Sequence, residues 1–215
     1  MLTGIVDLLF LLTAAGFGND SPQAFQAQPQ ALTSLGYQTF AVLDALWWIL
    51  MGFVVWSLGV FIEQFSPSRG RLASVCGIAT FVGALGGFTR KWAVPGLAAS
   101  SVSASPTQQT AILYTYDTLY NLTSAMFTTG IIFQAAGLLL VASALMVMPR
   151  FPRWLAALVA ISGVTASILS VLDIVARTYI FFPILLIHII VGSIGLQFAL
   201  AWRLRRPLTD SMPVS

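Results

Sequence analysis

The sequence predicts an all-α protein, a polytopic bundle of about six transmembrane helices. Three observations lead to this fold class. First, 58% of the 215 residues are hydrophobic and the mean hydropathy is +0.89. Second, only 8% of the residues are charged, whereas a soluble domain carries about a quarter charged residues. Third, the apolar residues gather in runs close to the ~20 residues that a helix needs to cross the hydrocarbon core.

Six such runs follow one another along the chain, at about 2–18, 41–62, 72–94, 126–147, 154–176 and 179–202. They are apolar on nearly all sides, whereas the strands of a transmembrane β-barrel alternate apolar and polar residues. Helices are therefore predicted for all six. Little chain remains for a soluble domain, so we expect a single transmembrane domain over residues 1–215.

The first run is the shortest, and it contains Asp7. Two interpretations stay open for it. One is a retained short helix, and the other is a cleaved signal peptide with its apolar region from Leu8 to Ala15. The absence of Lys and Arg before Leu2 favours the retained helix.

The gap between the second and third runs is a tight turn that contains Pro67, Arg69 and Arg71. The gap between the fourth and fifth runs is equally tight and contains Arg150 and Arg153. Three more arginines follow the sixth run: Arg203, Arg205 and Arg206. Short cytoplasmic loops retain Lys and Arg, so these gaps and both termini are predicted to be cytoplasmic.

The two remaining long gaps, at about 19–40 and 96–125, are predicted to be outer loops. The second is expected to be irregular from Ser100 to Pro106 and helical from about Thr107. Three tyrosines in it suit a membrane interface, where amphipathic rings settle: Tyr114, Tyr116 and Tyr120.

The net charge of +3 and the pI of about 9.4 follow from this topology and give no reason to expect a nucleic-acid partner. The layout of six short helices with tight inner turns, and the phrase Phe151-Pro152-Arg153-Trp154-Leu155 before an Ala/Gly-rich helix, resemble a bacterial family of small membrane proteins of unknown function. The resemblance implies a multi-pass protein of the bacterial cytoplasmic (inner) membrane. It implies no catalytic residues for this chain.

Charged residues at membrane depth are costly, so they tend to be paired or functional. Three acids and three bases are predicted to gather at the outer ends of the helices: Asp44, Arg90, Lys91, Asp117, Asp173 and Arg177. One interpretation is a ring of ion pairs, in which Arg90 reaches Asp44 or Asp173. The other is a site for an anion or zwitterion at the outer mouth.

Two further polar residues are candidates for a site within the membrane, namely Asp7 and His188. An imidazole near the middle of the last helix can relay protons or bind a quinone carbonyl. It can equally donate a structural hydrogen bond. Asp7 is a proton carrier if buried and an interfacial residue if the first helix starts shallow.

Cofactor chemistry is restricted by the single histidine and the single cysteine, Cys76. Bis-histidine haem needs two histidines, and a Cys/His zinc site needs several ligands. No metal site and no catalytic residues are therefore predicted, and no cofactor is specified. An enzyme is not expected.

Two functions from different classes remain. The first is a non-catalytic accessory or assembly subunit of a larger membrane complex. It would pack through small-residue faces such as Ala79-xxx-Gly83 and Gly163-xxx-Ser167, and through four aromatic residues: Trp47, Trp48, Phe53 and Trp56. The alternative is a small proton-coupled carrier or channel for a compact solute, with Asp7 and His188 in its path. The expected partners are the lipid bilayer and either a larger complex or further copies of the chain.

Overall fold

The computed structural model describes residues 20–149 and 151–176, together with Phe198 and Ala201. Over this part of the chain the structure is helical. Two short elements come first, α2 (Pro22–Ala27) and the 3₁₀ helix η1 (Pro29–Thr33). Four long helices follow: α3 (Leu35–Glu63), α4 (Pro67–Val102), α5 (Pro106–Val147) and α6 (Arg153–Ala176).

All four long helices are long and apolar enough to cross a membrane. The chain is therefore a multi-pass, all-helical membrane protein, which agrees with the predicted fold class at this level. The remaining predicted spans, at about 2–18 and 179–202, lie outside the described residues apart from Phe198 and Ala201.

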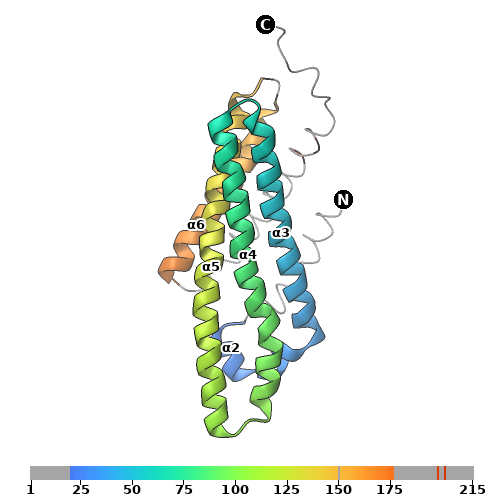
Figure 1. Ribbon diagram of the computed structural model, residues 1–215, viewed down its shortest axis with the longest axis vertical. Coiled ribbons are helices and arrows are strands. Elements are labelled where there is room, and N and C mark those ends of the chain that lie inside the picture. The colour runs from blue at the N-terminus through green and yellow to red at the C-terminus, as the bar shows by residue number, and fades with distance from the viewer. Residues whose placement is uncertain (1–19, 150, 177–197, 199–200, 202–215) are drawn as a thin grey trace.

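The second predicted outer segment, at 96–125, is mostly helical, because α4 continues to Val102 and α5 begins at Pro106 (Figure 1). Only residues 103–105 separate the two helices. The new helix starts at Pro106, close to the predicted start at Thr107. Ser105 caps it in a reciprocal capping box with Gln108, whose Oε1 accepts from the Ser105 main-chain N–H at 2.9 Å.

The first predicted outer loop, at 19–40, is also largely helical, since it contains α2, η1 and the first turns of α3. Ser34 is the N-cap of α3, which begins at Leu35, six residues before the predicted apolar run at about 41. Its Oγ accepts a hydrogen bond from the main-chain N–H of Tyr37 at 3.2 Å. Such a cap satisfies one of the donors left free at a helix N-terminus.

Neighbouring helices pack in chain order: α4 lies between α3 and α5, and α6 packs on α5 (Figure 1). The α3–α4 and α5–α6 turns share one end of the bundle, which we call the turn end. There the Arg69 guanidinium donates to the main-chain carbonyl of Ser143 at 3.3 Å. The α4–α5 turn lies at the opposite end, which we call the hairpin end.

Small residues let the helix backbones meet. A Cβ atom on Gly83 of α4 would lie 2.5 Å from the Cα atom of Gly130 on α5, and one on Gly77 would lie 2.5 Å from the main-chain nitrogen of Trp56 on α3. The close packing predicted at Gly83 is confirmed. At the second predicted motif, a Cβ on Gly163 would lie 2.9 Å from Cγ of Leu139.

The helices of the hairpin are much longer than a membrane span. α4 has 36 residues and α5 has 42, which correspond to about 54 and 63 Å at 1.5 Å per residue. The charge-free stretch of α4 between Arg71 and Arg90 rises only about 28 Å, as does that of α3 between Asp44 and Glu63. This matches a hydrocarbon core of about 30 Å. The helices then continue past Arg90 toward the hairpin end.

We call the folded region past this level, residues 20–40 and 92–121, the head. It contains α2, η1, the first turns of α3 and the joined ends of α4 and α5 (Figure 1). The charged residues described next lie at its base.

Candidate functional site: a charged cluster at the base of the head

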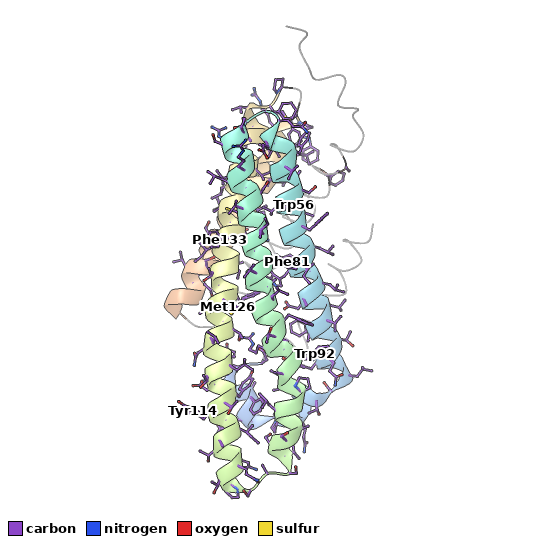
Figure 2. The ribbon with its side chains drawn as sticks, viewed as in Figure 1. Trp56, Phe81, Trp92, Tyr114, Met126 and Phe133 are labelled. Carbon is purple, nitrogen blue, oxygen red and sulfur yellow. The ribbon has the colours of Figure 1, made fainter. Side chains whose placement is uncertain are left out.

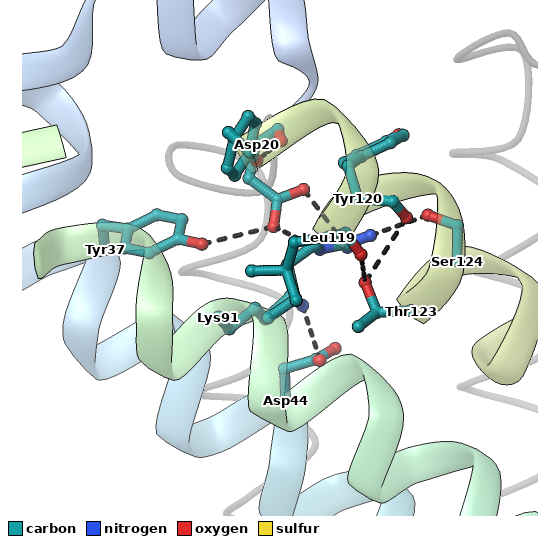
Figure 3. Close-up of polar contacts among 10 residues, drawn as sticks. Asp20, Tyr37, Asp44, Lys91, Leu119, Tyr120, Thr123 and Ser124 are labelled. Atoms are coloured by element: carbon teal, nitrogen blue, oxygen red, sulfur yellow. Dashed lines mark hydrogen bonds and ion pairs between the residues drawn. The ribbon is translucent and has the colours of Figure 1, made fainter. Parts of the chain in front are cut away.

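Two consecutive residues of α4, Arg90 and Lys91, supply the basic groups of the cluster. Figure 3 shows Lys91 beside Asp44, with Asp20 and Tyr37 nearby. Successive side chains on an α-helix point about 100° apart. Lys91 therefore reaches α3 while Arg90 reaches α5 and the segment before α2. Each base meets an acid of its own.

Lys91 forms a buried ion pair with Asp44 of α3. Its Nζ lies 2.5 Å from Asp44 Oδ2, and both side chains are 9% exposed. The ammonium group also lies 4.3 Å from the centre of the Phe40 ring, within the range of a cation–π interaction. The charge of Lys91 is thus neutralised and covered between α3 and α4.

Arg90 forms the second buried ion pair, with Asp20. Its Nε lies 3.3 Å from Asp20 Oδ2, and its Nη2 donates to Oδ1 at 3.4 Å. Nη1 donates to Ser124 Oγ on α5 at 2.8 Å. The guanidinium carbon lies 4.6 Å from the centre of the Tyr120 ring. One guanidinium therefore connects α4, α5 and the N-terminal segment.

Two tyrosines hold Asp20 in place. The Tyr37 hydroxyl donates to Asp20 Oδ2 at 3.2 Å, while the Tyr116 hydroxyl donates to the main-chain carbonyl of the same residue. The Tyr116 ring stacks on Phe25 of α2 with centroids 4.1 Å apart and planes within 15°. The side chain and the backbone of Asp20 are thus fixed by different residues.

Three of the six charged residues predicted to gather, Asp44, Arg90 and Lys91, come together. Asp44 binds Lys91, so the predicted pairing of Asp44 with Arg90 is wrong. Asp117 is exposed, and no ion pair involves it among the described residues. The side chain of Asp173 lies outside the described residues, as does the whole of Arg177.

Asp20 is the member of the cluster that sequence reasoning missed. It lies outside the apolar runs, in the first predicted outer loop. A local signal was present, since Ser21 and Pro22 are typical of a helix start, and Ser21 Oγ does accept from the Ala24 N–H at 3.2 Å. The contact with Arg90 depends on the folded head and has no local signal.

The burial of two groups of aromatic residues differs from the prediction. Tyr116, predicted at a membrane interface, is fully buried in the head, while Tyr114 is 76% exposed. Trp47 and Trp48, predicted to face partners, are buried within the bundle, where their rings pack edge to face 4.7 Å apart. Of the four partner-facing aromatics predicted, only Phe53 and Trp56 are exposed.

Gln134 is a buried polar side chain away from the cluster, and its amide is unsatisfied within the described part of the chain. Gln134 of α5 is fully buried between the glycines that pack at 130 and 137, and neither atom of its amide has a hydrogen-bond partner among the described residues. Asp7 and His188, the predicted site within the membrane, lie outside these residues. No group of three His, Cys, Asp or Glu side chains that could hold a metal ion occurs in the described ranges.

The fold and the cluster define a multi-pass helical membrane protein with two buried ion pairs at the base of a folded head. The chain belongs to the family described as a domain of unknown function, DUF4386, whose model matches residues 36–202. This confirms the predicted resemblance to a family of unknown function. The match includes Tyr37, Asp44, Arg90 and Lys91, and it begins after Asp20. No curated protein and no solved structure shows significant similarity to the chain.

Proposed function

We propose that the chain is a non-catalytic subunit of a larger membrane complex and that its head binds a protein partner outside the bilayer. One observation carries the proposal. α4 and α5 run past the charged cluster as a joined hairpin, and buried tyrosine and ion-pair contacts tie α2 and α3 to it. A helix that served only to cross the bilayer would need none of these additional turns.

The surface of the head suits a protein partner. From Trp92 to Thr123 the sequence contains one charged residue, Asp117. Protein interfaces are depleted of charge at their centre and enriched in tyrosine. Within this stretch, Tyr114 projects outward from α5 (Figure 2).

The orientation is part of the proposal. The turn end carries Arg69, Arg71 and Arg153, and short loops rich in arginine stay in the cytoplasm. The head would then stand on the outer side of a bacterial inner membrane. The side chain of Arg71 already pairs with Glu63 there, with Nε 2.7 Å from Oε1.

Native mass spectrometry tests the proposal on protein extracted from its own membranes in mild detergent. We expect co-purification with other chains in a fixed ratio, and loss of these chains when the head carries Tyr114→Asp. Trp154→Asp at the turn end is the matched control, since Trp154 is also exposed, and it should keep the partner. A monomer or a homo-oligomer in the extract contradicts the subunit role.

A carrier or channel for a proton or compact solute is the second candidate, and Gln134 favours it. A buried amide without a hydrogen bond is costly in the membrane interior, and transport pathways are where such polar groups occur. Asp7 and His188 remain its proposed path residues. The test measures proton flux into proteoliposomes that hold the purified chain alone. Flux that is lost in His188→Ala would support the carrier, and absence of flux from the natural chain would exclude it.

A further inference from the structure

Arg90 presents the donors of a carboxylate-binding site, and Asp20 supplies the carboxylate. A guanidinium recognises a carboxylate through two parallel N–H groups. Nε and Nη2 of Arg90 face the two oxygens of Asp20 in this way, and the Tyr37 hydroxyl adds a third donor. Ser124 fixes the guanidinium from the opposite side through Nη1.

The contacts between the Asp20 carboxylate and Arg90 are long. They measure 3.3 and 3.4 Å, whereas charge-assisted N–H···O bonds measure about 2.7–2.9 Å. Among the described residues, no acceptor completes a hydrogen bond with Arg90 Nε. The neighbouring Lys91–Asp44 pair, at 2.5 Å, is much tighter.

The backbone of Asp20 does not depend on its carboxylate. The Tyr116 hydroxyl holds the main-chain carbonyl, and the ring of Tyr116 stacks on Phe25 in the following helix. Ser21 caps that helix through its own hydroxyl. None of these contacts, which hold the start of α2 in place, involves the carboxylate of Asp20.

We propose that Arg90 and Tyr37, oriented by Ser124, form a binding site for a compact free carboxylate that competes with the side chain of Asp20. The site selects a small ligand because the group that it now holds is a single carboxylate whose side chain is only 7% exposed. Paired N–H groups of a guanidinium can bind either a carboxylate or a phosphate, and we assign a carboxylate because that is the group which the site now holds. This inference goes beyond the proposed subunit role and does not rest on it.

Acetate is the probe, titrated calorimetrically into the full-length protein in detergent, with sodium chloride at equal ionic strength and pH as the reference. Asp20→Asn removes the internal competitor. We expect it to bind acetate at least about ten times more tightly than the natural chain does, because occupancy of a site by a competitor weakens apparent affinity in proportion. The double variant Asp20→Asn/Arg90→Gln should not bind acetate. Asp44→Asn removes the carboxylate of the neighbouring pair and should bind acetate no better than the natural chain.

Equal acetate affinity in Asp20→Asn and the natural chain, or no binding by either, would overturn the proposal. Tighter binding of inorganic phosphate than of acetate would overturn the ligand class. If Asp20→Asn is too unstable for calorimetry, thermal unfolding serves instead. Its midpoint should then rise with acetate concentration, as expected for a ligand that binds only the folded state. A midpoint that rises no more than that of Asp44→Asn contradicts the site.

Discussion

At the scale of single residues, burial of four charged side chains at the base of the head costs desolvation free energy. They are the members of the two ion pairs, Arg90–Asp20 and Lys91–Asp44. Each charge is offset by its partner, and removal of one member leaves the other buried alone. A buried pair contributes little net stability compared with apolar residues of similar size, whereas a broken pair is strongly destabilising. The Lys91–Asp44 pair gives a direct test of this asymmetry.

Lys91→Met should lower the free energy of unfolding by about 3 kcal/mol, because it leaves Asp44 buried without its cation. The double variant Lys91→Met/Asp44→Leu should recover most of this loss, since it removes both charges from the contact between α3 and α4. Thermal unfolding in detergent, followed by circular dichroism, measures both. A double variant as unstable as Lys91→Met alone would contradict the pairing.

For Gln134 we expect the opposite effect, a gain in stability when the polar group is removed. Its amide is fully buried and has no hydrogen-bond partner among the described residues, and such a group costs about 1–3 kcal/mol. Gln134→Leu should therefore raise the midpoint of thermal unfolding. Leu138→Gln is the control, because Leu138 is fully buried one turn further along α5, and it should lower the midpoint. A clear loss of stability in Gln134→Leu would mean that the amide is hydrogen-bonded in the membrane.

At the scale of the helices, contact between α4 and α5 depends on glycine. Gly83→Ala would drive a Cβ atom to 2.5 Å from the backbone of Gly130, and such overpacking costs about 1–3 kcal/mol. Gly96→Ala on the same helix has no atom within 4 Å of the new Cβ, so it should be neutral or stabilise by up to about 1 kcal/mol. Thermal unfolding compares the two, and equal effects would contradict the proposed helix contact.

The same helices show what the sequence can and cannot predict. Their membrane portions follow from unbroken apolar runs, so α3 to α6 were expected. The ends of α4 and α5 carry Ser, Ala, Thr and Gln without an apolar period, and their helical state depends on mutual packing and on the Ser105 cap. Asp44, Arg90 and Lys91 could be grouped by their depth along the helices. The pairing of Arg90 with Asp20 depends on how α2 docks, which no local pattern encodes.

At the scale of the whole molecule, the proposed orientation can be measured by cysteine labelling. Cys76, the single native cysteine, is buried, and Cys76→Ala provides the background. Ser103→Cys in the α4–α5 turn should react with a membrane-impermeant maleimide in intact cells. Ser68→Cys at the turn end should react only after permeabilisation. The reverse pattern would contradict the orientation, and labelling of both in intact cells would contradict a membrane-spanning α4.

Arg90 and Lys91 are consecutive on α4, and this restricts how the helix can move. Rotation of α4 about its axis would carry both side chains away from their acids at once, and a slide of one turn would do the same. The two ion pairs therefore resist rotation and sliding of α4 against α3 and α5. α6 packs on α5 and takes part in neither ion pair, so neither pair opposes a shift of α6 along α5.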